Sequence, residues 1–123
     1  MNVTLRDERN TTFLEGAPSE PLLASAGEVN QLIEACFAEG VHAVLLHAAN
    51  LPPAFFDLST GQAGEILQKL RNYRIRLALV AAPGTQLSSR FGELLADERR
   101  GAHFGMFESR PEAVEWLALR AAE

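Results

Sequence analysis

This 123-residue sequence has one cysteine, one lysine and no long apolar run, and each scarcity excludes a class of protein. Cys36 cannot form an internal disulfide, which is typical of proteins in the reducing cytoplasm. No apolar run approaches the roughly 18 residues that span a bilayer, and the N-terminal segment carries acids without an apolar stretch. We therefore expect a cytoplasmic protein with neither a membrane partner nor a secretory signal.

Lys69 is the only lysine among 11 basic residues, and 16 acidic residues bring the net charge to −5. This charge repels nucleic-acid phosphates, so we expect no nucleic-acid partner. Arg71, Arg74 and Arg76 indicate either a small anion patch or a solvated helix end. The nucleotide-binding patterns G-x-x-x-x-G-K-[ST] and G-x-G-x-x-G are absent, and no residues have metal-ligand spacing. We expect no cofactor and no metal.

What the sequence does contain is the hydrophobic content of one folded domain, with 47% hydrophobic residues. Alternating residues over about 2–16, interrupted by turn-forming residues, predict a β-hairpin. β–α units follow over about 25–120, and their crossovers make the later strands parallel. The prediction is a single α/β domain over 1–123, with a mixed sheet (an antiparallel N-terminal hairpin plus parallel strands) and about four helices.

Local signals set the bounds of the predicted elements. Capping boxes over residues 25–28 and 109–112 mark the starts of the first and last helices, and Gly40 ends the first. The elements predicted after the hairpin are, in chain order, a helix at 25–40, a strand at 41–48, a helix at 60–73, a strand at 75–81, a helix at 89–99, a strand at 102–107 and a helix from 109. Helical periodicity places Phe37 and Tyr73 on inward faces.

The longest predicted loop, residues 49–59, stands beyond the carboxyl end of a strand, where ligands bind in open α/β sheets. Ser59 and Thr60 lie at its end, just before a helix. Ser59 and Gln62 have the spacing of a capping box, which would make the hydroxyl a structural cap. Alternatively, Ser59 or Thr60 is a phosphorylation site, because a helix N-terminus stabilises a phosphate through free N–H groups and the helix dipole.

Phe55 and Phe56 bring two aromatic rings into this loop. Exposed rings would form a docking patch for a partner, whereas buried rings would fill the core beneath the loop, which is the commoner arrangement. A further possibility is that a second copy of the chain covers the aromatic loop, which would make the protein a homo-oligomer.

A second interpretation of the same region is catalytic. His47, Asp57 and Ser59 could lie around one crevice and act as the set of a small hydrolase. The G-x-S-x-G elbow that exposes a nucleophilic serine is absent, and Asp57 and Ser59 are neighbours in one loop. The absence of an assembled catalytic set favours a protein that binds rather than reacts.

The segment FFDLSTGQAGEILQKLRNYRIRLALV, residues 55–80, resembles the core motif of a bacterial family, domain of unknown function 4180 (DUF4180). The family pattern is FFDL-x-TG-x-AGE-x-LQK-x-x-NYR followed by an apolar strand, and this sequence matches every specified position. The resemblance continues through the last strand to Glu115, Trp116 and Leu117 in the last helix, so it spans nearly the whole chain. It implies kinship with a bacterial family and assigns no reaction.

The order of elements also looks like that of the anti-sigma-factor antagonist (STAS) and SpoIIAA-like folds. Those folds carry a phosphorylatable serine before the second helix in a D-x-S-G-like context, and residues 57–61 here read Asp-Leu-Ser-Thr-Gly. One extra residue separates Ser59 from the glycine, so Thr60 matches the position as well as Ser59 does. This resemblance implies a small regulatory domain.

The leading hypothesis is a non-enzymatic regulatory or binding domain that presents residues 50–64 to a protein partner or a small ligand. The alternatives are a small hydrolase and an oligomeric interaction domain. The residues predicted to bind the partner or ligand are Asn50, Phe55, Phe56, Asp57, Ser59, Thr60, Gly61 and Gly64.

Overall fold

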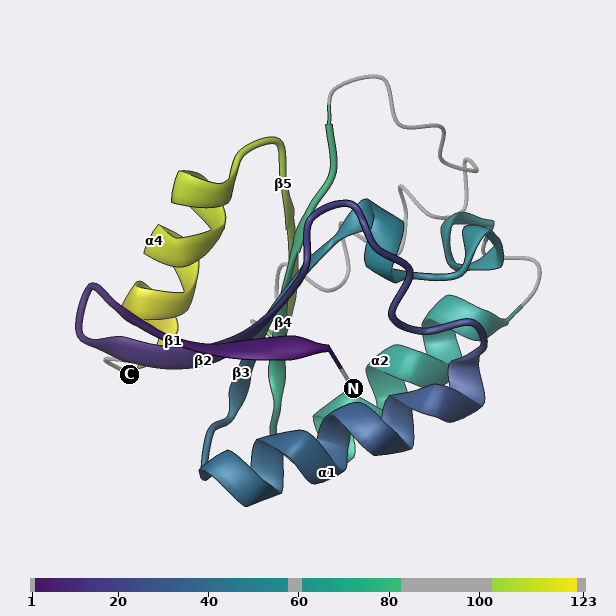
Figure 1. The fold of residues 1–123 in the computed structure, drawn as a ribbon, viewed down its shortest axis with the longest axis horizontal. Helices are drawn as coiled ribbons and strands as arrows, with labels where there is room; N and C mark the ends of the chain where they lie inside the picture. Colours follow the sequence, from purple (N-terminus) through teal and green to yellow (C-terminus); the bar gives the residue numbers. More distant parts are fainter. Residues whose placement is uncertain (1, 58–60, 83–102, 122–123) are drawn as a thin grey trace.

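A five-stranded mixed sheet with helices on both faces forms the centre of the protein (Figure 1). The computed structural model describes residues 2–57, 61–82 and 103–121. The strands, which lie side by side in chain order, are β1 (Val3–Glu8), β2 (Thr11–Gly16), β3 (Ala43–His47), β4 (Arg76–Val80) and β5 (Phe104–Phe107). β1 is antiparallel to β2, and the other neighbouring pairs are parallel, which confirms the predicted mixed sheet.

The N-terminal hairpin turns through Arg9 and Asn10, which both have left-handed backbone conformations, with φ of 51° and 61°. Two consecutive residues of this kind are typical of the tight turn whose twist matches that of the flanking strands. Thr4 therefore faces Glu15 across the hairpin. This register places alternate residues of β1 and β2 on the same face of the sheet.

Two helices, α1 (Val29–Glu39) and α2 (Gln62–Asn72), cover one face of the sheet (Figure 1). A single 3-10 turn, η1 (Ala26–Glu28), precedes α1, and the Glu28 carboxylate accepts hydrogen bonds from the backbone N–H groups of Ala24 and Ser25. Large buried side chains between this helical layer and the sheet include Leu14, Leu32, Val44, Leu46, Phe55, Ile66, Leu70, Leu77 and Phe104. They form the larger of the two hydrophobic clusters.

The opposite face of the sheet is covered by α4 (Arg110–Ala121) (Figure 1). The Glu112 N–H donates to Ser109 Oγ at 3.4 Å, as the predicted capping box requires. The core on this side consists of Phe13, Leu45, Ala78, Ala113, Val114 and Leu117. Leu45 thus packs under α4 while its neighbours Val44 and Leu46 pack under the other helices, which explains the continuous apolar run of β3.

The predicted loop between β3 and α2 contains two 3-10 turns, η2 (Ala48–Asn50) and η3 (Pro53–Phe56). The N-cap of α2 is Gly61, with φ of 77°, whereas the predicted capping box would begin the helix at residue 60; Ser59 itself lies outside the described residues. The physical reason is that glycine adopts this left-handed conformation without strain from a Cβ. The predicted helix at 89–99 lies outside the described residues.

Phe37 and Tyr73 are not inward, in contrast to the prediction from periodicity. They are 56% and 48% exposed and contact each other edge to face, with ring centroids 5.4 Å apart. Both stand near the C-terminal ends of their helices. By contrast, Cys36 is fully buried, and burial raises the pKa of its thiol to about 11. No helix within the described residues has the length and apolar character needed to cross a membrane.

Candidate functional site

A buried carboxylate lies near the carboxyl end of β2, on the face covered by α4. Glu15 is the second-last residue of β2 and is only 5% exposed. Strand alternation directs its side chain to the same face as Phe13. A buried carboxylate needs compensating partners, because removing it from water disfavours its charge.

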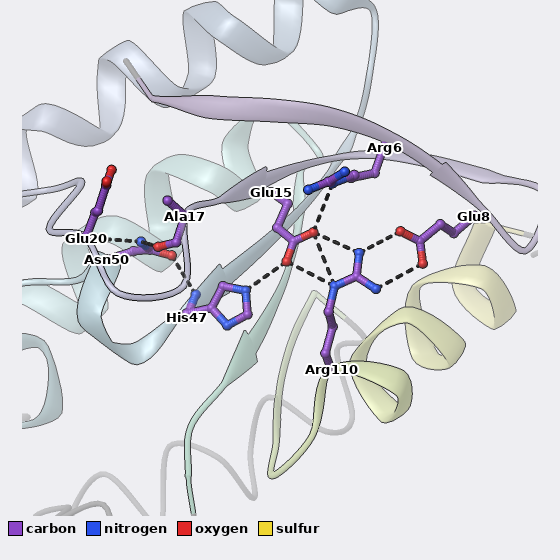
Figure 2. Close-up of polar contacts among 8 residues, drawn as sticks. All are labelled: Arg6, Glu8, Glu15, Ala17, Glu20, His47, Asn50 and Arg110. Atoms are coloured by element: carbon purple, nitrogen blue, oxygen red, sulfur yellow. Dashed lines mark hydrogen bonds and ion pairs between the residues drawn. The ribbon is translucent and has the colours of Figure 1, made fainter.

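The main partner of Glu15 is Arg110, the first residue of α4. Arg110 Nε donates to Glu15 Oε2 at 3.0 Å and Nη2 donates to Glu15 Oε1 at 2.8 Å (Figure 2). The same guanidinium also donates to both oxygens of Glu8, at 3.0 and 2.6 Å. The planar fork of one arginine therefore holds two carboxylates and ties the start of α4 to the hairpin.

His47 completes the arrangement from the end of β3. Its Nε2 lies 2.8 Å from Glu15 Oε2, and the imidazole is the donor because an ionised carboxylate only accepts hydrogen bonds (Figure 2). Arg6 Nε lies 3.3 Å from Glu15 Oε1. We call the five residues Arg6, Glu8, Glu15, His47 and Arg110 the Glu15 cluster.

The charges of the Glu15 cluster stabilise one another. Burial raises the pKa of Glu15, but hydrogen bonds from Arg110 and His47 outweigh burial, and the net pKa lies below the ordinary value of 4.5. The hydrogen bond from Arg110 also lowers the pKa of Glu8. Both carboxylates in turn raise the pKa of Arg110. The cluster is thus built of fixed charges, and Glu15 does not have the raised pKa of a general acid at neutral pH.

A pocket of about 470 Å³ opens beside the cluster, and we call it the Glu15 pocket. It is lined by Thr4, Arg6, Glu8, Glu15, Gly16, Ala17, Pro18 and Arg110. Its volume is within the range of small-molecule sites. Side chains of both charge signs reach it, so the pocket matches a ligand that carries both an acidic group and hydrogen-bond donors.

Asn50 holds one wall of the Glu15 pocket in place. Its side chain is fully buried, and Nδ2 donates to the backbone carbonyls of Ala17 and Glu20 at 2.7 and 2.8 Å (Figure 2). Its Oδ1 accepts a hydrogen bond from the His47 N–H at 2.7 Å. A Cβ on Gly16 would lie 2.5 Å from Asn50 Oδ1, so only glycine fits there. Asn50 is therefore a positioning residue in this structure, and its side chain does not reach the surface.

The other residues predicted to bind a partner are divided between core and surface. Phe55 is fully buried and contacts Phe56 edge to face at 5.3 Å, so Phe55 fills the core as the structural interpretation predicted. Phe56 is half-buried, whereas Asp57, Gly61 and Gly64 are exposed. Contact of these residues with a partner stays a prediction.

Ser59 and Thr60 lie outside the described residues, so phosphorylation of either hydroxyl also stays a prediction. Of the proposed hydrolase set, His47 is held by Glu15 and not by Asp57, which is exposed after η3. Within the part of the chain that the structure describes, no group of three histidine, cysteine or carboxylate side chains is placed to hold a metal ion.

Glu8, Glu15 and Arg110 were not identified from the sequence. One signal was available: Glu15 follows Phe13 and Leu14 in a strand and interrupts an otherwise apolar segment. A carboxylate at a buried strand position requires a cation, but the sequence offers ten arginines and does not indicate which one folds against it.

Comparison with known proteins connects the chain to one family. The model of the family described as "Domain of unknown function (DUF4180)" matches residues 8–117, which is nearly the whole chain. No curated protein and no solved structure matches the chain. The match includes most of the described Glu15 cluster, since only Arg6 falls outside the matched range.

Proposed function

The chain belongs to the DUF4180 family, and we propose that it is a non-enzymatic binding domain whose ligand occupies the Glu15 pocket. The ligand class is a small molecule that carries a carboxylate and an amino or hydroxyl group. Residues 50–64 contribute to this site through Asn50, which holds the pocket wall. The proposal thus keeps the predicted carboxyl edge as the binding region.

The observation that carries the proposal is that Arg6 is half-exposed at the pocket and makes one ion-pair contact within the protein. Its side chain is 49% exposed at the pocket and has one ion-pair contact, at 3.3 Å, with Glu15. A guanidinium has five N–H donors, so Arg6 has donors left for a carboxylate. Arg110, by contrast, uses its donors on Glu8 and Glu15 and forms the rigid back of the site.

The hydrogen-bond acceptors of the Glu15 pocket match the amino or hydroxyl group of the proposed ligand. Glu8 is 37% exposed, and the pKa of its carboxyl is lowered, so it stays ionised at neutral pH. Thr4 faces Glu15 across the hairpin and adds a hydroxyl. A ligand ammonium or hydroxyl group near Glu8 and a ligand carboxylate near Arg6 would therefore both find partners.

The test is a two-dimensional NMR titration of the full chain with each of the twenty free amino acids as probes. At least one is expected to shift the amide resonances of Thr4, Gly16 and Ala17. The variant Arg6→Gln should weaken this binding about tenfold, because it removes one charge-assisted hydrogen-bonded pair. Arg9→Gln is the matched control, since Arg9 lies in the hairpin turn and does not line the pocket.

Two results would overturn the proposal. One is a titration in which no probe shifts the pocket resonances. The other is binding that Arg6→Gln and Arg9→Gln weaken equally, because the ligand would then respond only to net charge.

The hydrolase remains a second candidate because of one observation. A histidine that is oriented by a carboxylate is part of the usual serine-hydrolase triad, and His47 has such a partner in Glu15, which it contacts through Nε2, so that Nδ1 is the nitrogen left to accept a proton. A fluorophosphonate probe reacts with activated serines, so labelling of Ser59 that is lost in His47→Gln would favour the enzyme. An unlabelled wild-type protein would favour the binding domain.

A further inference from the structure

A second pocket lies at the end of the sheet opposite to the Glu15 pocket, where the parallel strands begin. Its volume is about 550 Å³, and we call it the basic pocket. The residues that line it are His42, Arg71, Arg74, Arg76 and His103. Every one of these side chains is basic, and none of the described residues that line the pocket is acidic.

The fold brings these residues together from three strands and one helix end. The Arg76 N–H donates to the carbonyl of His42 at 2.9 Å, and the Leu77 N–H donates to the carbonyl of His103 at 2.9 Å. The starts of β3, β4 and β5 are therefore fixed side by side. Arg74 stands in the tight turn that follows α2, with a left-handed φ of 59°. The pairing of the strands and this turn together bring the basic side chains into one pocket.

Two polar atoms of the basic pocket lack hydrogen-bond partners among the described residues. Arg76 Nε and His103 Nδ1 are both buried, and neither has a hydrogen-bond partner among the described residues. Buried polar groups in folded proteins are nearly always hydrogen-bonded, and a missing bond destabilises the fold. Two such atoms in one pocket lined by arginine and histidine side chains indicate a site that is complete only when an external group enters it.

We propose that the basic pocket binds the phosphoryl group of a small phosphorylated molecule. A phosphoryl group has three acceptor oxygens and close to two negative charges at neutral pH, so it can accept from several arginines at once. A carboxylate offers two oxygens and one charge, which leaves more of these cations without a partner. The site is distinct from the Glu15 pocket, whose mixed charges match a ligand with groups of both kinds.

The volume of the basic pocket favours a small molecule over a nucleic acid. About 550 Å³ is within the range of small-molecule sites, whereas a nucleic-acid site needs an extended basic surface. The chain as a whole has a net charge of −5, so the positive charge is local. A compact anion is therefore the ligand whose size and charge both agree with the pocket.

Isothermal titration calorimetry at constant ionic strength tests the proposal with three probes: inorganic phosphate, glycerol 3-phosphate and glycerol. Both phosphates are expected to bind and glycerol is not. Tighter binding of glycerol 3-phosphate would show that the pocket recognises the organic part, and equal binding would show that it takes the phosphoryl group alone. Both outcomes support a phosphoryl site.

Arg74→Gln and Arg76→Gln should each weaken phosphate binding about tenfold, as expected when a charge-assisted hydrogen bond is lost. Arg9→Gln, which removes the same charge from a side chain that does not line the pocket, should leave the affinity within about twofold. Arg74 is exposed, so its substitution tests the site even if Arg76→Gln alters folding. A urea midpoint of Arg76→Gln at or above that of wild type is also expected, since the variant removes a buried donor without an acceptor.

The absence of heat with both phosphates would overturn the proposal. So would affinities that are the same in the wild type and in Arg74→Gln. A single-stranded oligonucleotide that binds more tightly than glycerol 3-phosphate, and whose binding is lost in Arg74→Gln, would overturn it in favour of nucleic-acid recognition. Because Arg6 does not line this pocket, these results are independent of the amino-acid titration.

Discussion

The side chain of Asn50 joins three segments at the carboxyl edge of the sheet. The side chain donates to the carbonyls of Ala17 and Glu20 and accepts from the N–H of His47. The backbone carbonyl of Asn50 also accepts hydrogen bonds from the N–H groups of Leu22 and Leu23. An irregular segment that lies against the core must satisfy its backbone groups, and here one amide side chain does so. The conformation of residues 17–23 therefore depends on Asn50, which is 30 positions from Glu20 in the sequence.

We expect Asn50→Ala to lower the free energy of unfolding by about 2–4 kcal/mol, because it leaves buried backbone donors and acceptors without partners. Urea unfolding followed by circular dichroism measures the change. Asn30→Ala is the matched control, since Asn30 is exposed on α1 and alanine is a better helix former, so its stability should change by less than about 0.5 kcal/mol. Equal effects of the two substitutions would contradict a structural role for Asn50.

Gly16 and Asn50 should be energetically coupled. Gly16→Ala alone is expected to destabilise the protein by about 1–3 kcal/mol, because its Cβ would overlap Asn50 Oδ1. In the double variant Asn50→Ala removes that oxygen, so the second substitution should add little. A double-mutant cycle measures this coupling, and strictly additive effects would show that the close contact is not the cause.

At the scale of elements, Arg110 decides how α4 docks. Its guanidinium connects the first turn of the helix to both strands of the hairpin, so one contact sets the position of an element that covers a whole face of the sheet. The two strands of the hairpin supply one carboxylate each. The apolar side chains Ala113, Val114 and Leu117 also pack α4 against the sheet, and apolar contacts are less directional.

Arg110→Met should destabilise the protein by about 2–3 kcal/mol, because it leaves the buried Glu15 carboxylate with only His47 and Arg6 as partners. The double variant Arg110→Met with Glu15→Gln should recover part of this loss, since the unpaired charge is gone. Chemical denaturation of the four proteins measures both effects. If the double variant is less stable than Arg110→Met alone, the buried charge is not the origin of the loss.

The whole molecule separates its charges in space. The paired charges of the Glu15 cluster lie near the carboxyl end of β2, and the basic side chains of the basic pocket lie where the parallel strands begin. The net charge of −5 of the whole chain describes neither region. Charges paired within the protein stabilise the fold, whereas basic side chains that line an open pocket can contact a ligand.

Acid should destabilise the molecule through the Glu15 cluster. The pKa values of Glu8 and Glu15 in the folded protein lie below the ordinary 4.5, so their contribution to stability is present above pH 4.5 and is lost as pH falls through the folded-state values. Urea midpoints measured between pH 6 and pH 3 should therefore fall at the acidic end. Glu15→Gln should flatten this dependence more than Glu39→Gln, a substitution at the exposed end of α1. Identical pH profiles of both variants would contradict the prediction.

Much of the fold could be predicted from the sequence because its signals are local. The capping residues of α1, the glycine that ends it and the alternation of the hairpin strands act over a few residues, and the structure confirms them. Periodicity failed for Phe37 and Tyr73, because it identifies a helix face, whereas both residues stand at helix ends, where they are exposed and contact each other. The predicted start of α2 at residue 60 was wrong because Gly61 provides a competing start for the helix.

The sequence by itself therefore determined the mixed α/β sheet and the family, and it predicts a binding region at the carboxyl edge. Only the tertiary structure decided which side chains meet there, since Glu15 and Arg110 are 95 residues apart. It also decided that His42, Arg76 and His103 converge at the starts of three strands. The physical reason is that secondary structure follows from interactions between near neighbours, whereas the pairing of charges depends on packing across the sheet, which no short segment encodes.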